Sequence, residues 1–109
     1  MLGRHGHILT TMYQKFIITN DGVLRFGTVH LHRDLIPQGD DGCHGGGFWQ
    51  VDEQRGMIIL HGRSYDYGPP DFKFATSIDR NTISDLPTYP VFYRSGVEGH
   101  EKYEPIRAF

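Results

Sequence analysis

The dipeptide Asp21-Gly22 constrains the fold of this chain most, because it stands between two apolar runs at residues 15–19 and 23–32. Asp-Gly between apolar runs is among the strongest short signals for a β-hairpin, since these residues tolerate the positive φ of a tight turn. A second hairpin is predicted from residues 48–52 and 56–63, which flank the turn at Glu53-Gln54-Arg55-Gly56. The chain is therefore expected to consist largely of antiparallel hairpins.

Two short apolar runs predict further features of the sheet. Residues 57–60 have the sequence Met-Ile-Ile-Leu, which predicts a central strand that is buried on both faces. Residues 91–93 follow two prolines and have the sequence Val-Phe-Tyr, which predicts a last strand.

One helix is expected after the second hairpin. Asp71 is a favourable helix N-cap, and Phe72, Ala75 and Ile78 would share one face of the helix that it starts. The predicted fold class is therefore α+β, a single small domain with a mostly antiparallel sheet of about five strands and one or two short helices.

Composition limits the domain count and the classes of partner. A chain of 109 residues forms one domain, which we assign to residues 12–109, with residues 1–11 as a flexible N-terminal extension. The net charge of −2 argues against nucleic acid as a partner. No run approaches the ~20 apolar residues of a membrane span, and no signal-peptide pattern stands at the start. Cys43 is the only cysteine, so we expect no internal disulfide and a cytoplasmic location.

Two glycine motifs carry the chemistry that the sequence suggests. Cys-His-Gly-Gly-Gly at residues 43–47 is separated by fourteen residues from Gly-Arg-Ser-Tyr-Asp-Tyr-Gly-Pro at residues 62–69. The hydroxyl of Ser64 and the successive N–H groups after a strand end could form a concave anion site, for which phosphate is the natural guest. The alternative is an ordinary loop in which Gly and Pro only form turns.

Together these motifs resemble the Janus/Ocnus family, whose best-known members are small phosphohistidine phosphatases. Asp21-Gly22-Val23 with Arg25 is similar to a family segment with a phosphate-binding lysine, and His32-Arg33-Asp34-Leu35 is similar to the family's catalytic segment. The resemblance implies a metal-independent phosphatase without a cofactor, in which His32 is the general base or the nucleophile. It implies phosphate-binding roles for Arg25, Arg63, Ser64, Tyr65 and Asp66, and structural roles for Gly45, Gly46, Gly47, Gly62 and Gly68. The expected partner is a phosphorylated protein or a small phosphorylated ligand.

The chain also departs from the family pattern. Only nine residues separate Gly22 from His32, whereas the family has a long loop and a further strand there. Either the strand at 23–32 does the work of two family strands, or His32 is merely the end of the first. Asp66 replaces a small apolar residue, and its carboxylate would repel phosphate unless Arg63 or Arg25 pairs with it. A catalytically silent phosphate-binding, ligand-binding or protein-interaction domain is therefore the alternative function.

Two other interpretations of the reactive side chains stay open. His30, His32 and Asp34 have the spacing of metal ligands in some metallo-hydrolases, and His44 and His61 could complete such a site. The simpler interpretation is that His30 and His61 are ordinary strand residues, as Cys43 is an ordinary half-buried thiol. Exposed sheet edges would allow a homodimer.

Overall fold

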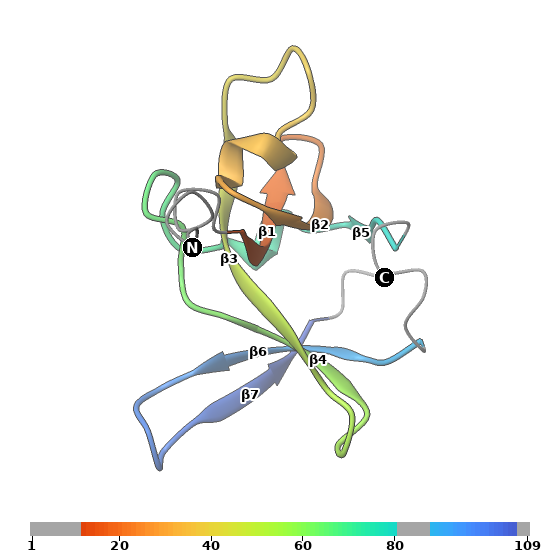
Figure 1. The fold of residues 1–109 in the computed structure, drawn as a ribbon, viewed down its shortest axis with the longest axis vertical. Coiled ribbons are helices and arrows are strands. Elements are labelled where there is room, and N and C mark those ends of the chain that lie inside the picture. The colour runs from red at the N-terminus through yellow and green to blue at the C-terminus, as the bar shows by residue number, and fades with distance from the viewer. Residues whose placement is uncertain (1–11, 81–87, 107–109) are drawn as a thin grey trace, which may run out of the picture.

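The computed structural model describes residues 12–80 and 88–106, so the predicted flexible extension at residues 1–11 lies outside the described residues. Within the described part, the chain forms one seven-stranded sheet in the order β5-β2-β1-β3-β4-β6-β7 (Figure 1). The strands are β1 (Tyr13–Thr19), β2 (Val23–Val29), β3 (Cys43–Asp52), β4 (Met57–His61), β5 (Ser77–Ile78), β6 (Val91–Ser95) and β7 (Lys102–Pro105). Two short 3₁₀ turns are also present: η1 (His32–Leu35) lies between β2 and β3, and η2 (Phe72–Phe74) lies between β4 and β5.

The hairpin predicted around Asp21-Gly22 is confirmed. β1 and β2 pair antiparallel with Phe16 opposite Phe26, and Gly22 has a φ of +85°. The Gly22 N–H donates a 2.9 Å hydrogen bond to the carbonyl of Thr19, which closes the turn. β2 ends at Val29, however, so the predicted strand at residues 23–32 is too long. The chain leaves the sheet there, and His32 therefore sits in η1 rather than in a strand.

The central strand predicted at residues 57–60 is also confirmed. β4 lies in the interior of the sheet between β3 and β6, and Ile58 and Leu60 are completely buried. Its pairing with β3 is the expected antiparallel hairpin, but its pairing with β6 is parallel. β2 and β5 are also parallel, so the sheet is mixed. The two parallel pairs join segments distant in sequence, which local hairpin signals cannot indicate.

The predicted α+β class is wrong, because the described residues contain no α-helix. The carboxylate of Asp71 does accept the Lys73 N–H at 3.4 Å, but the turn that it caps ends after Phe74. Ala75 has a ψ of 121°, and the chain continues into β5, where Ile78 lies opposite Leu24 in a parallel pair. The β-branched Ile78 packs against the core from this strand, and this tertiary contact outweighs the helix signal at Asp71.

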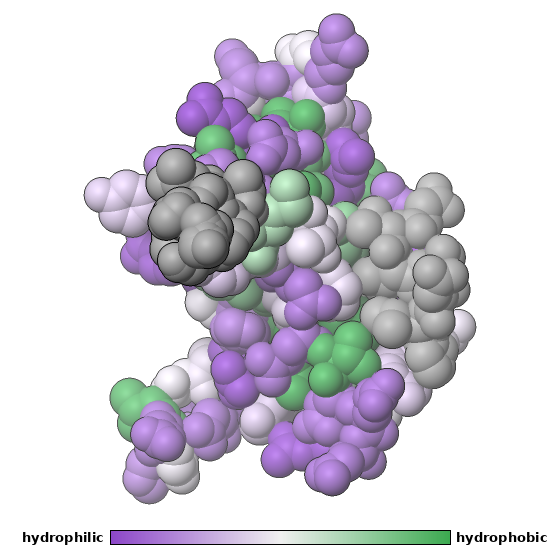
Figure 2. Space-filling model, viewed as in Figure 1, coloured by the Kyte–Doolittle hydropathy of each residue, from purple (hydrophilic) through white to green (hydrophobic). Residues whose placement is uncertain are grey.

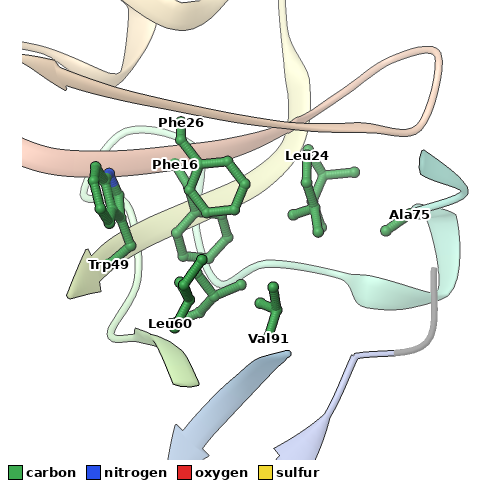
Figure 3. Packing of buried hydrophobic residues seen from close by; sticks show 9 residues of the cluster. Phe16, Leu24, Phe26, Trp49, Leu60, Ala75 and Val91 are labelled. Atoms are coloured by element: carbon green, nitrogen blue, oxygen red, sulfur yellow. The ribbon is translucent and has the colours of Figure 1, made fainter. Parts of the chain in front are cut away.

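The core occupies one face of the sheet and contains Phe16, Leu24, Phe26, Trp49, Leu60 and Val91 (Figure 3). The rings of Phe26 and Trp49 meet edge to face with centroids 5.8 Å apart. The Trp49 Nε1–H donates to the carbonyl of Gly27 at 3.3 Å, which satisfies the only polar atom of the indole. Because side chains alternate along a strand, neighbouring residues such as Lys15, Ile17 and Phe48 project from the opposite face.

The β6–β7 hairpin extends away from the rest of the described chain (Figures 1 and 2). Its connecting turn carries Val97, which is 69% exposed. No helix in residues 12–80 and 88–106 has the length and apolar character needed to cross a membrane.

Candidate functional site

A cleft of about 500 Å³ lies on the sheet face opposite the core. It brings together β1, the end of the β2–η1 connection, β3 and the loop that follows β4. Its lining consists of Lys15, Leu31, His32, Phe48, Arg63, Tyr65 and Asp66. Four of the six residues predicted for catalysis and phosphate binding thus lie together. The other two, Arg25 and Ser64, do not line the cleft.

His32 is held in the cleft by the η1 turn and by β3. The N–H of Leu31 donates to Oδ2 of Asp34 at 3.0 Å, and this bond fixes the start of the turn. The His32 side chain then lies against the sheet, and only 6% of its surface is exposed. Its Nε2 lies 2.8 Å from the carbonyl oxygen of Gly47, and its ring meets Phe48 edge to face with centroids 5.4 Å apart.

The three consecutive glycines of β3 make this close packing possible. A Cβ at Gly46 would collide with the carbonyl oxygen of Phe16 and lie 3.2 Å from Cδ2 of His32. A Cβ at Gly47 would lie 2.6 Å from the carbonyl oxygen of His61. Gly45 has a φ of +88°, a conformation that residues with a side chain rarely adopt. The Gly-Gly-Gly motif therefore permits the close approach of the His32 ring and the neighbouring backbone to β3.

The environment of His32 favours its neutral form. Burial lowers the pKa of the imidazole from its ordinary value of 6.5, and the nearby charge of Lys15 lowers it further. The hydrogen bond to Gly47 and the charge of Asp66 act in the opposite direction. Because a carbonyl can only accept, Nε2 carries the proton and Nδ1 of the neutral ring carries the lone pair. The Cδ2–Nε2 edge faces the glycines of β3, so Nδ1 is on the side of the ring away from that strand.

Lys15 is a site residue that the motifs did not reveal. It is only 8% exposed, and its Nζ donates a hydrogen bond to the carbonyl oxygen of His30. It lies directly opposite Phe48 in the β1–β3 pair and lines the cleft, and its charge acts on the imidazole of His32. The sequence did contain one signal that could have identified this residue, since Lys15 stands in an apolar strand two residues before Ile17. A buried lysine is rare unless it is paired or functional.

The loop from Gly62 to Gly68 is organised by Ser64, whose side chain is fully buried. The Ser64 N–H bonds the carbonyls of Gly46 and Gly68 at 2.8 and 3.2 Å, and the Ser64 Oγ accepts the N–H of Tyr67 at 3.0 Å. Ser64 therefore attaches the loop to β3 and also forms the hydrogen bonds that hold the two ends of the loop together. The Ser64 hydroxyl, which the sequence predicts to bind phosphate, points into the loop instead of into the cleft.

The remaining charged residues of the prediction differ in placement. Arg25 lies on β2 opposite Ile17, outside the set of residues that line the cleft. Arg63 and Asp66 both line it, but within the described chain no ion pair joins them. The backbone N–H groups of Tyr65 and Asp66 have no hydrogen-bond partner among residues 12–80 and 88–106. These two N–H groups are therefore available to an anion.

The residues considered as metal ligands are scattered. His32 lies in the cleft, whereas His44 stacks on Phe74 with centroids 4.0 Å apart and His61 packs beside Phe48. No group of three or more His, Cys, Asp or Glu side chains in the described chain could hold a metal ion. Cys43 is half-buried, and burial raises the pKa of its thiol, as expected of an inert structural cysteine.

No protein-family model, curated protein or solved structure matches this chain. Its function therefore has to be inferred from the chemistry of the cleft.

Proposed function

We propose that this domain binds a phosphorylated substrate in the cleft and hydrolyses its bond to phosphorus without a metal, with His32 as general base or nucleophile. The observation that carries the proposal is the position of a neutral imidazole beside two cationic side chains, Lys15 and Arg63, in one cleft. The similarity of the glycine motifs to the Janus/Ocnus family supports the same conclusion and suggests phosphohistidine as the substrate. On this proposal the chain is a shortened and divergent relative of that family.

The charges in the cleft suit a phosphoryl group. A phosphate monoester carries between about −1.5 and −2 charges at pH 7. Lys15 and Arg63 supply two positive charges, and Asp66 removes one of them. The N–H groups of Tyr65 and Asp66 would add uncharged donors, which hold phosphoryl oxygens without a further counter-ion.

Hydrolysis by either route requires a lone pair at a fixed position, which Nδ1 of His32 would supply. As a base, Nδ1 of His32 would take a proton from water while the water oxygen bonds to phosphorus and the bond from phosphorus to the substrate nitrogen breaks. The electron pair of the broken bond stays on the leaving imidazole, which takes up the proton from His32 or from solvent. As a nucleophile, Nδ1 would bond to phosphorus while the bond from phosphorus to the substrate nitrogen breaks, and the leaving imidazole would take a proton from solvent. A water oxygen would then bond to phosphorus as the Nδ1–phosphorus bond breaks, which releases phosphate and returns the lone pair to Nδ1. In both routes Lys15 and Arg63 offset charge on the phosphoryl oxygens.

A second candidate is a domain that binds phosphate or another ligand but is catalytically silent. The observation in its favour is the 6% exposure of His32, which leaves little of the ring open to a substrate. The hydroxyl of Ser64 also faces into the loop, so it does not supply the contact with phosphate that the family resemblance implies.

The deciding experiment follows phosphate release from a phosphohistidine peptide by ³¹P NMR in the presence of EDTA. We expect turnover by the wild type, its loss in His32→Asn, and its retention in the matched control His30→Asn. Calorimetry with inorganic phosphate should show weaker binding by Lys15→Met. Phosphate binding without turnover by the wild type would establish the silent alternative. Activity that EDTA removes and zinc restores would contradict the metal-independent mechanism, and absence of both binding and turnover would overturn the proposal.

The proposal extends to the setting of the protein. Its partner would be a phosphorylated protein or a small phosphorylated ligand in the cytoplasm. β5 and β7 are the outer strands of the sheet in the part of the chain that the structure describes, and such edges are compatible with a homodimer.

A further inference from the structure

We propose that the ligand of this cleft carries a separate cationic group, an ammonium or a guanidinium, beside its phosphoryl group, and that Asp66 and Tyr65 bind this cation. The inference deepens the proposed function and rests on it, because it takes Lys15 and Arg63 as the phosphoryl-binding side chains. It adds a second recognition element, which selects among phosphorylated partners by the charge next to the phosphoryl group.

A phosphoryl group alone leaves the position of Asp66 unexplained. Its carboxylate lines the same cleft as Lys15 and Arg63, and a negative charge beside a phosphoryl group opposes binding. No ion pair within residues 12–80 and 88–106 neutralises Asp66. The guanidinium of Arg63 lies toward the end of the loop, since its Nη2 atom is 4.0 Å from the position of a Cβ at Gly68. Asp66 is therefore available to a cation that the ligand brings.

Charge balance favours a ligand that carries such a cation. Lys15 and Arg63 contribute two positive charges to the lining and Asp66 contributes one negative charge, so the lining has one positive charge in excess. A phosphoryl group with about two negative charges would leave about one of them uncompensated. An adjacent ammonium or guanidinium reduces the net charge of the ligand to about −1. That charge matches the lining.

Burial separates the two parts of the cleft. Lys15 and His32 are only 8% and 6% exposed, so a phosphoryl group reaches them at the bottom of the cleft. Tyr65 is 97% exposed, and the exposed Asp66 follows it on the loop that Ser64 attaches to β3. The rest of a ligand whose phosphoryl group lies at the bottom would therefore pass Tyr65 and Asp66 at the mouth of the cleft.

The side chains of Tyr65 and Asp66 together suit an ammonium or a guanidinium. A carboxylate forms charge-assisted hydrogen bonds with either group, and the face of a tyrosine ring attracts a cation. Within the described chain no lysine or arginine lies over the Tyr65 ring, so its faces are open to the ligand. The N–H groups of the same two residues are the proposed donors to the phosphoryl oxygens. The cation site therefore adjoins the phosphoryl site directly.

Aminoethyl phosphate and propyl phosphate provide a matched test, because they have chains of similar length that end in an ammonium and a methyl group. In calorimetry at about pH 8, where both phosphates are doubly ionised, we expect the wild type to bind aminoethyl phosphate about fivefold more tightly. Asp66→Asn removes the charge but keeps the backbone N–H. It should weaken the binding of aminoethyl phosphate and strengthen that of propyl phosphate, whereas a general loss of structure would weaken both.

Two further variants complete the comparison. Tyr65→Ala should reduce the preference for aminoethyl phosphate, because it removes the ring that faces the cation. Glu98→Gln is the matched control for the loss of a carboxylate, because Glu98 is exposed in the turn between β6 and β7, and it should leave the preference unchanged.

Phosphopeptides then identify the source of the cation. Peptides with lysine, norleucine or glutamate next to the phosphorylated residue differ in charge at that position. A preference for the lysine peptide, reversed in Asp66→Lys, assigns the cation to a basic residue of a phosphorylated protein. Equal affinity for the three peptides, with aminoethyl phosphate still preferred, assigns it to a small zwitterionic ligand.

Two results would overturn the inference and leave the proposed function intact, provided that inorganic phosphate still binds. One is equal affinity of the wild type for aminoethyl and propyl phosphate, and the other is an unchanged preference in Asp66→Asn. Failure to bind inorganic phosphate or any of the esters would overturn both the inference and the proposed function.

Discussion

The Nε2 atom of His32 lies 2.8 Å from the carbonyl oxygen of Gly47 and donates a hydrogen bond to it. This bond joins the η1 turn to β3, and it determines which nitrogen of the ring carries the lone pair. It also brings the ring to within 3.2 Å of the position that a Cβ at Gly46 would occupy, although the first obstruction there is the backbone carbonyl of Phe16. The glycine at position 46 therefore accommodates both the neighbouring strand β1 and the His32 ring.

Replacing Gly46 by valine should destabilise the protein. The new side chain would meet the carbonyl of Phe16 and the ring of His32, and the strain should lower the free energy of unfolding by about 1–3 kcal/mol. Urea denaturation of Gly46→Val measures this loss. Gly42→Val is the matched control, because nothing lies within 4 Å of a Cβ at Gly42. Equal stability of the two variants would show that the close approach at Gly46 is not required.

Stability should depend on pH through His32 and His61. Burial lowers the pKa of both imidazoles from the ordinary value of 6.5, and Arg94 contributes at His61. The unfolded chain therefore binds more protons than the folded chain at pH values between the folded pKa and 6.5. We expect full stability above about pH 6.5 and a progressive loss as pH falls through the folded pKa values. Urea denaturation at a series of pH values tests this, and His32→Gln should show a smaller loss than the wild type.

The charges beside His32 should shift its titration in opposite directions. Lys15 lowers the pKa of the imidazole and Asp66 raises it, so Lys15→Met should raise the pKa and Asp66→Asn should lower it. Two-dimensional NMR of the histidine Cε1–H groups follows the titration directly. The wild-type protein in the same buffer is the reference for both variants. Shifts of the same sign in both variants would contradict the arrangement of the cleft.

Ser64→Ala should loosen the loop that carries the proposed anion site. The substitution removes the acceptor of the Tyr67 N–H, a loss that typically costs about 1 kcal/mol of stability. It should also weaken phosphate binding, because the N–H groups of Tyr65 and Asp66 would lose their fixed direction. Urea denaturation and calorimetry with inorganic phosphate measure the two effects. Arg63→Met is the comparison, since it should weaken binding through loss of charge while leaving stability nearly unchanged.

Local signals in the sequence were sufficient for the hairpins and for the central strand. Asp21-Gly22 closes the first hairpin because the turn requires a positive φ at Gly22, which is a property of the glycine itself. The apolar run at residues 57–60 became β4 for an equally local reason, since a short run of β-branched residues is suited to a buried strand. The glycines at residues 45–47 were likewise assigned to backbone geometry, although the neighbours that they accommodate were not predictable.

Tertiary contacts decided the fold class and the composition of the cleft. The N-cap at Asp71 stabilises only a short turn, and the packing of the half-buried Ile78 beside Leu24 in a parallel strand pair replaced the predicted helix. Lys15 belongs to the cleft because β1 lies beside β3, a pairing between segments far apart in the chain. Of the residues that the motifs named as candidates, His32, Arg63, Tyr65 and Asp66 line the cleft. Arg25 lies outside the cleft because of its strand register, and Ser64 lies outside it because its side chain is buried in the loop. A sequence motif specifies residue types and local turns, whereas the direction of each side chain depends on which strands pair and in which register.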